Sequence, residues 1–153
     1  MKRIMFVCHG NICRSPMAEF IFKYLATKEG VSDSFVIASS ATSTEEIWNG
    51  IGNPIYPQAR DELRRQGVPF TDRRAVQLKK SDYEKYDLFL GMDSANIRNM
   101  KNIFGGDHEG KIKKLMDYTS RGGDVADPWY SGKFDTAFRD IFDGCSALLD
   151  NLK

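Results

Sequence analysis

The most restrictive feature of this sequence is a short apolar segment followed directly by a polar loop and then by an amphipathic segment. Ile4 to Val7 form a continuous apolar run, which is typical of a strand buried on both faces of a parallel sheet. After the loop, Ser15-Pro16 supplies a helix N-cap and a proline at the first helical position. Apolar residues then recur at helical spacing from Met17 to Leu25. The amino-terminal part of the chain therefore predicts a strand, a loop and a helix, the last ending before Gly30.

The rest of the chain repeats this alternation. We expect further strands near residues 35–38, 88–92 and 112–116, and further helices near residues 56–66, 95–104 and 134–152. Two long polar stretches, Ser40 to Pro57 and Asp117 to Lys133, predict loops at the sheet edge where open α/β folds bind ligands. The chain of 153 residues has no internal repeat or linker, so we expect one α/β domain over residues 1–153.

Charge and cysteine content narrow the class of function. The 22 basic and 21 acidic residues nearly cancel, which argues against a nucleic-acid binder because such domains are usually strongly basic. The amino-terminal apolar run is too short for a signal-peptide core or a membrane span. Cys8, Cys13 and Cys145 are an odd number, and two of them share one loop, which is a poor disulfide framework. We therefore expect a cytoplasmic protein with no nucleic-acid or membrane partner.

The loop Cys8-His9-Gly10-Asn11-Ile12-Cys13-Arg14-Ser15 follows the first strand, at the carboxyl edge of the sheet. A loop that runs into a helix N-terminus can turn successive backbone N–H groups toward one point and bind an anion there. Gly10 and Asn11 tolerate the left-handed backbone conformations that such a curled loop requires. The sequence therefore predicts an oxyanion site in this loop.

The spacing of Cys8 and Arg14 adds nucleophilic chemistry to that site. Thiols at helix N-termini beside cations have pKa values of roughly 3.5 to 7.5, so we expect Cys8 to be an ionised nucleophile. Arg14 can return across the loop and bind two oxygens of a phosphate with its planar guanidinium. Ser15 is placed to cap the helix and to offer its hydroxyl to the thiolate. Cys145 falls on the apolar face of the last helix and is expected in the core.

Two motifs carry a resemblance to a known family. The residues from Val7 to Pro16 resemble the signature of the low-molecular-weight protein tyrosine phosphatases, and Asp127-Pro128-Trp129-Tyr130 resembles the acid-loop motif of that family. Length, motif order and α/β alternation agree along essentially the whole chain. The resemblance implies a four-stranded parallel sheet flanked by helices, a phosphocysteine intermediate, and no metal or other cofactor. It also implies that the substrate is a phosphotyrosine protein or a small aryl phosphate.

The resemblance assigns roles to individual residues. It makes Cys8 the nucleophile, Arg14 the group that binds the phosphate and the transition state, and Asp127 the general acid and later base. Asn11 would hold the left-handed turn of the loop, and Ser15 would assist the thiolate. The phosphate-binding loop as a whole comprises His9, Gly10, Asn11, Ile12, Cys13, Arg14 and Ser15.

The resemblance also suggests supporting residues. Ser32 and Ser39 are similar to serines that support the loop from behind, and Asp93 resembles a structural acidic position. The family often places a histidine that hydrogen-bonds into the loop network, and here Asp72 stands in that place. The residues expected to wall a slot for a flat phenyl ring are Trp48, Trp129 and Tyr130, with Trp129 where many members have the first of two tyrosines.

Several alternatives remain open from the residues alone. Cys13 either packs in the core or captures an oxidised Cys8 as a disulfide. An arsenate reductase of the same fold would need two further cysteines near residues 75–95, and that stretch has none. A phosphopeptide-binding module would be expected to lack Cys8 or Asp127, and both are present. The physiological substrate could be a host phosphoprotein, a bacterial tyrosine kinase or a small phosphate ester, and the oligomeric state is equally open.

Overall fold

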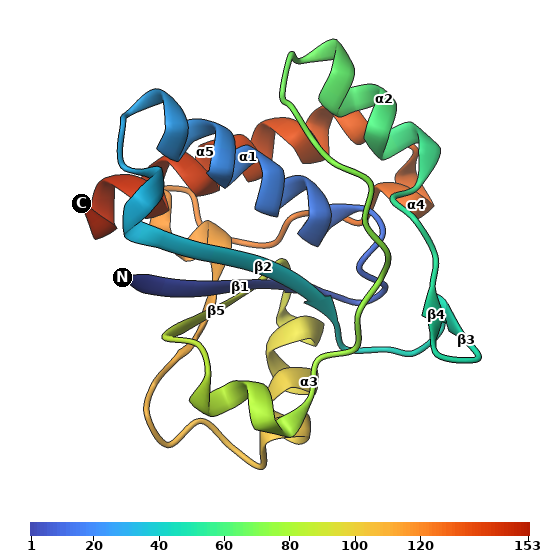
Figure 1. The fold of residues 1–153 in the computed structure, drawn as a ribbon, viewed down its shortest axis with the longest axis vertical. Helices are drawn as coiled ribbons and strands as arrows, with labels where there is room; N and C mark the ends of the chain where they lie inside the picture. Colours follow the sequence, from blue (N-terminus) through green and yellow to red (C-terminus); the bar gives the residue numbers. More distant parts are fainter.

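A four-stranded parallel sheet forms the centre of the molecule, which is described here by a computed structural model of residues 1–153 (Figure 1). Its strands are β1 (Lys2–Cys8), β2 (Phe35–Ala41), β5 (Leu88–Gly91) and β6 (Ile112–Lys114), in the order β2-β1-β5-β6. Every neighbouring pair is parallel, so the predicted fold class is confirmed. The strand that leads into the cysteine loop, β1, is a central strand and pairs on both sides.

Helices cover both faces of this sheet. Three of them, α1 (Arg14–Lys28), α2 (Pro57–Arg65) and α5 (Phe134–Leu152), lie on one face, and α3 (Ser94–Phe104) lies on the other (Figure 1). Successive side chains of β1 point to opposite faces of the sheet, so this strand contributes to the core on both sides. Ile4, Phe6 and Cys8 belong to the larger apolar cluster under α1 and α5, whereas Met5 and Val7 belong to the smaller cluster under α3. Full burial of each large apolar side chain contributes roughly 1.5 to 3 kcal/mol, so the end of β1 is firmly held.

The element boundaries differ from the sequence expectations in two informative places. Helix α1 begins at Arg14 with Cys13 at the N-cap position and no side-chain cap, so the prediction that Ser15 caps this helix is wrong. Ser15 lies inside the first turn, where its hydroxyl is free for another partner. The last strand ends at Lys114 rather than Met116, because the chain turns into a 3₁₀ helix (Leu115–Tyr118) that buries Leu115 and Met116 in the larger cluster.

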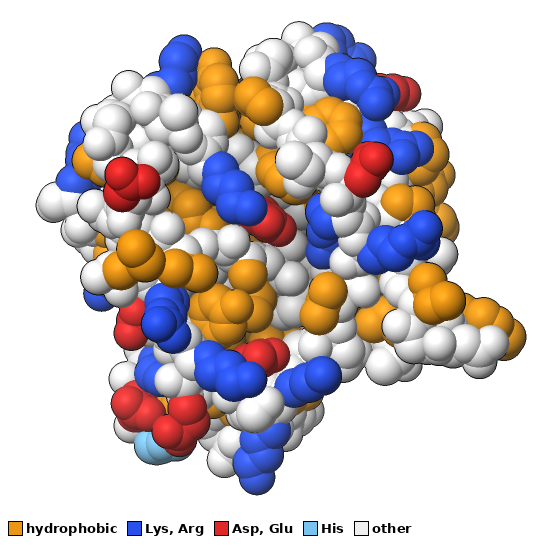
Figure 2. All heavy atoms as spheres, in the orientation of Figure 1, with side chains coloured by type: hydrophobic (Ala, Val, Ile, Leu, Met, Phe, Trp, Pro, Cys, Tyr) orange, Lys and Arg blue, Asp and Glu red, His pale blue; other side chains and the backbone are white.

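Both long polar stretches contain short elements. The first holds a hairpin, β3 (Ile47–Trp48) and β4 (Ile51–Gly52), whose turn residues Asn49 and Gly50 both have positive φ, as a tight hairpin turn requires. This hairpin lies at the side where β1 and β2 end, and its exposed apolar side chains project from the molecule (Figures 1 and 2). The second holds the one-turn helix α4 (Pro128–Ser131).

The remaining regular elements are two 3₁₀ helices, at Ser32–Ser34 and Lys80–Glu84. None of the helices combines the length and the apolar character that crossing a bilayer would take.

Candidate active site

The sulfur of Cys8 is the point on which the loop after β1 converges. The backbone N–H groups of Asn11 and Ser15 donate to Sγ at 3.3 and 3.4 Å, and the hydroxyl oxygen of Ser15 lies 3.0 Å from it. All three residues are buried, so water does not compete for these contacts. The first turn of α1 supplies two of the three groups, which also places the sulfur at the positive end of the helix dipole. Three hydrogen-bonding groups and the positive end of a helix dipole therefore meet at this sulfur.

Asn11 holds the loop in its curled shape. Its φ of 59° is the left-handed conformation predicted for this position. The backbone N–H of Val76 donates to Asn11 Oδ1 at 3.0 Å, and because a backbone N–H can only donate, this contact fixes the orientation of the side-chain amide. The Nδ2 group therefore donates to the hydroxyl oxygens of Ser15, at 2.8 Å, and Ser39, at 3.0 Å.

The direction of the remaining hydroxyl protons follows from these contacts. Ser39 donates its proton to Glu19 Oε1 at 2.7 Å. Ser15 accepts from Asn11, so its own proton is available for the sulfur of Cys8. The hydroxyl of Ser15 can therefore donate to the sulfur of Cys8, in addition to the two backbone groups.

Arg14 is buried, with only 3% of its side chain exposed, and is anchored by an ion pair with Asp93. Its Nη1 donates to Asp93 Oδ2 and to the carbonyl of Val125, both at 2.8 Å. Burial by itself lowers the pKa of Arg14, but the negative charges of Cys8, Asp93 and Asp127 outweigh burial and raise that pKa above its usual value. With Nη1 occupied, the Nε and Nη2 donors of a fixed guanidinium can bind an oxyanion.

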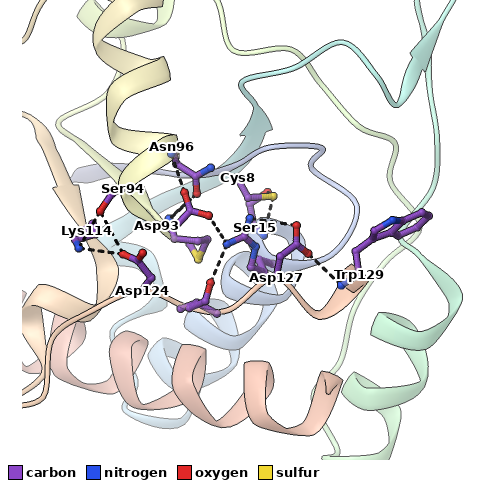
Figure 3. A network of polar contacts seen from close by, with 12 residues as sticks. Cys8, Ser15, Asp93, Ser94, Asn96, Lys114, Asp124, Asp127 and Trp129 are labelled. Carbon is purple, nitrogen blue, oxygen red and sulfur yellow. Dashed lines mark hydrogen bonds and ion pairs between the residues drawn. The ribbon is translucent and has the colours of Figure 1, made fainter. Parts of the chain in front are cut away.

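Asp93 has two tasks in this arrangement. Besides pairing with Arg14, it begins helix α3 by accepting from the backbone N–H of Asn96 at 2.8 Å, in a reciprocal capping box (Figure 3). A carboxylate held by a helix N-terminus is a rigid partner for the arginine. Asp93 thus links Arg14 to the start of α3.

Asp127 approaches the same point from the loop before α5. Its Oδ2 lies 3.6 Å from Arg14 Nη2, and its Oδ1 accepts from the backbone N–H of Trp129 at 3.1 Å, which caps α4 (Figure 3). Its side chain is partly exposed and lines the cleft above Cys8. The residues lining this cleft are Cys8, His9, Gly10, Asn11, Ile12, Cys13, Arg14, Glu45, Glu46, Asp127, Trp129 and Tyr130.

Two of the three aromatic residues expected to wall the cleft do line it. Trp129 packs edge to face against Tyr56, with 4.8 Å between ring centroids, and Tyr130 is 87% exposed. Trp48 does not line the cleft, so its prediction as a wall residue is wrong: its side chain is 81% exposed on the projecting hairpin. The register of that short hairpin, which the sequence pattern did not reveal, directs Trp48 outward.

Glu45 and Glu46 take the place expected for Trp48 at the rim of the cleft. His9 Nε2 lies 3.0 Å from Glu45 Oε2, and Glu46 accepts from Asn53 Nδ2 at 2.9 Å. Sequence reasoning missed both residues. Their signal was a pair of acidic residues a few positions after a strand, on the edge of the sheet that carries the cysteine loop.

The three residues considered as loop supports lie in different surroundings. Ser39 lies behind the loop, as expected, with its hydroxyl on Asn11. Ser32 is exposed in the 3₁₀ helix that precedes β2, at the opposite end of the sheet, so its prediction as a loop support is wrong. Asp72 is exposed and makes no contact with the loop, whereas its neighbour Arg73 does.

Arg73 was not recognised from the sequence. Its Nη1 donates to the backbone carbonyl of Asn11 at 2.7 Å, and its Nη2 donates to Asn11 Oδ1 and, at 3.4 Å, to Ser39 Oγ. The segment is extended here, so successive side chains alternate: Asp72 and Arg74 face solvent, whereas Arg73 points inward. That alternation is the signal that could have selected Arg73.

The other two cysteines have different surroundings. Cys13 is buried in the cleft wall, and this burial, with the neighbouring charge of Cys8, raises the pKa of its thiol. Cys145 is buried in the core, as predicted, and donates to the carbonyl of Ala18 at 3.7 Å. All three cysteines are free thiols. No three side chains of His, Cys, Asp or Glu cluster as metal ligands.

Comparison with known proteins gives a consistent result. Residues 3–153 match the family model described as low molecular weight phosphotyrosine protein phosphatase. The low molecular weight protein-tyrosine-phosphatase YfkJ of Bacillus subtilis is 37% identical, with 100% of this chain and 97% of YfkJ aligned. The human low molecular weight phosphotyrosine protein phosphatase is 34% identical over 97% of this chain and 94% of that protein. The crystal structure of YfkJ superimposes with a TM-score of 0.93, covering 99% of this chain and 94% of that one at 36% identity.

Proposed function

Because this chain belongs to the low-molecular-weight phosphotyrosine protein phosphatases, we propose that it hydrolyses aryl phosphate monoesters through a phosphocysteine at Cys8. The family acts through a cysteine nucleophile and needs no metal, and its substrates contain phosphotyrosine. One observation carries the assignment to individual residues: three donors converge on the sulfur of Cys8 in a cleft that Arg14 and Asp127 also line.

The first step transfers the phosphoryl group to sulfur. The thiolate of Cys8 attacks phosphorus as the bond from phosphorus to the phenolic oxygen breaks. Backbone N–H groups of the loop and the guanidinium of Arg14 bind the equatorial oxygens, where the charge of a loose transition state is spread. Asp127, in its acid form, gives its proton to the departing oxygen. A phenol with a pKa near 10 leaves poorly as an anion, and general acids typically contribute roughly 10²- to 10⁴-fold.

The second step releases inorganic phosphate. Asp127, now a carboxylate, takes a proton from the water that attacks phosphorus, and the bond between phosphorus and sulfur breaks. Cys8 leaves as a thiolate, which the Ser15 hydroxyl and the two backbone N–H groups stabilise. The same three donors thus support the nucleophile in the first step and the leaving group in the second.

The rim of the cleft supports a flat aromatic leaving group. Trp129 and Tyr130 present ring surfaces beside Asp127, and Trp129 is braced by Tyr56. A phenyl ring packed against these side chains would bring its phosphate down to Cys8. We therefore include both phosphotyrosine in proteins and small aryl phosphates among the substrates.

We also infer that the enzyme works in the cytoplasm. Its mechanism depends on a reduced Cys8, and the chain keeps three free, buried thiols and no disulfide. Such thiols persist in reducing compartments and are prone to oxidation elsewhere.

Trapping the phosphoenzyme tests this proposal. Rapid acid quenching during turnover of an aryl phosphate, followed by mass spectrometry of the peptides, should find one phosphate on Cys8. Cys8→Ser should fold and lose turnover, because an unactivated hydroxyl is a much weaker nucleophile at neutral pH. Phosphate on another residue, or turnover by Cys8→Ser close to that of the wild type, would assign the chemistry elsewhere.

A further inference from the structure

Arg73 is a charged residue beside the cysteine loop that takes no part in the two chemical steps proposed for the enzyme. It lies in the extended segment after α2, which is bonded to the end of β2 through Ala41 N–H to Val76 O at 2.7 Å and Leu78 N–H to Ala41 O at 2.8 Å. These backbone bonds hold the segment against the back of the cysteine loop. The guanidinium is partly buried there, and burial lowers the pKa of Arg73, with Glu19 and Cys8 opposing that effect. An arginine nevertheless stays charged at any physiological pH.

The guanidinium clamps a single residue of the loop. One nitrogen donates to the backbone carbonyl of Asn11 and the other to its side-chain oxygen. A non-glycine residue with positive φ is uncommon and persists where its surroundings over-determine it. Two bonds from one planar group to the two oxygens of Asn11 supply such a restraint, which the point charge of a lysine would not.

The same clamp is connected to the nucleophile by hydrogen bonds that all run in one direction. Arg73 donates to Asn11 Oδ1, Asn11 Nδ2 donates to Ser15 Oγ, and Ser15 donates to the sulfur of Cys8. Each donor in such a chain polarises the next, and the effect is strongest where the local dielectric is low. A positive charge at the start of the chain strengthens the final donor and stabilises negative charge on sulfur.

We propose that Arg73 is a positioning residue that locks Asn11 in its left-handed conformation and, through Asn11 and Ser15, stabilises the thiolate of Cys8. This inference rests on the proposed role of Cys8 and deepens it. It identifies a second arginine for the site: Arg14 holds the substrate phosphate from the front, and Arg73 supports the sulfur from behind. The charged residues around this part of the loop are Arg14, Arg73, Glu19, Glu46, Asp93 and Asp127.

The test compares Arg73→Gln with Arg74→Gln. Arg74 is the adjacent arginine and has the same charge, but its side chain is exposed and its Nη1 donates to the carbonyl of Gly52 on the hairpin, away from Cys8. Two quantities are measured: kcat/KM for p-nitrophenyl phosphate, and the rate of Cys8 alkylation by iodoacetamide from pH 5 to pH 8. Alkylation reports the thiolate directly and does not depend on turnover.

We expect Arg73→Gln to lower kcat/KM by about 10- to 100-fold, the range for losing hydrogen bonds to a charged group. Its alkylation profile should shift to higher pH, whereas Arg74→Gln should stay within about two-fold of the wild type in both measurements. If Arg73→Gln does not melt cooperatively, the proposal is tested with Arg73→Lys instead. It keeps the charge without the two-pronged clamp, so kcat/KM should still fall several-fold.

Equal behaviour of the folded Arg73 and Arg74 variants, in kcat/KM and in alkylation, would overturn the role of Arg73. If Arg73→Gln does not fold, an Arg73→Lys variant with the same kcat/KM as the wild type would also overturn the role of Arg73. If the proposed role of Cys8 itself were wrong, the result would be different: phosphate would then not protect Cys8 of the wild type from alkylation.

Discussion

Removing the hydroxyl of Ser15 should slow the second chemical step more than the first. In Ser15→Ala the thiolate of Cys8 loses its contact at 3.0 Å and keeps two backbone donors at 3.3 and 3.4 Å. Ser15 is fully buried, so no water can replace the hydroxyl. A hydrogen bond to a charged group contributes about 1.5 to 3 kcal/mol, which corresponds to about 10- to 150-fold in rate. Because the two backbone donors remain, we expect a loss of about 10- to 30-fold, in the lower part of that range.

The loss should appear in breakdown of the phosphoenzyme, where Cys8 is the leaving group. Stopped-flow measurement with p-nitrophenyl phosphate should therefore show a burst of p-nitrophenol of about one equivalent, followed by slow turnover. Ser40→Ala is the matched control, because Ser40 is also buried but its hydroxyl has no hydrogen-bond partner. A Ser15→Ala enzyme without a burst and with unchanged kcat would refute the reasoning. So would an equal loss in both variants, which would point to a general effect of removing a buried hydroxyl.

Four other outcomes are expected. Asp127→Asn should slow esters of poor leaving groups by about 10²- to 10⁴-fold and those of good ones much less, so an equal loss across a leaving-group series would show that Asp127 is not the acid. Turnover should be unchanged in excess chelator, since the nucleophile is a thiolate; activity that vanishes and returns with Mg²⁺ would contradict this. Peroxide should convert Cys8 to a sulfenic acid, which the thiol of Cys13 captures as a disulfide with loss of water. Cys13→Ser should then keep basal turnover but recover less in thiol reductant, and equal recovery would leave Cys13 as a packing residue. Gly52→Ala would place a methyl 2.0 Å from the carbonyl oxygen of Ala75, so its melting temperature should fall by several degrees, and an unchanged value would show that the hairpin moves freely.

The sequence alone determined the parts of this protein that depend on near neighbours in the chain. The strand from Lys2 to Cys8, the curled loop and helix α1 follow one another directly, so apolar pattern and residue type were enough to predict them. The same local pattern placed Cys8, the proposed nucleophile, and the loop around it. The fold class also followed, because alternating strands and helices of these lengths admit few arrangements other than a parallel sheet.

Two local expectations were wrong because the sequence pattern does not give the exact start of a helix or the direction of each side chain in an extended segment. Ser15 was predicted to be the N-cap of α1, but the N-cap is Cys13, two residues earlier, and the hydroxyl of Ser15 contacts Cys8 instead. Asp72 stands where the family often has a histidine, but the alternation of an extended segment carries it to the surface. Arg73 is the next residue, and in an extended segment neighbouring side chains point to opposite faces, so Arg73 faces the loop and Asp72 faces solvent.

Only the tertiary structure decided which distant residues meet at the site. Arg73 and Asn11 are 62 positions apart, and Arg14 reaches Val125 across 111 positions. The turn of the β3–β4 hairpin and the backbone bonds between residues 75–78 and β2 settle which side chains face the cleft, so Glu45 and Glu46 line it and Trp48 does not. Residue types record what a side chain can do, but the closure of loops over the sheet edge determines what it touches.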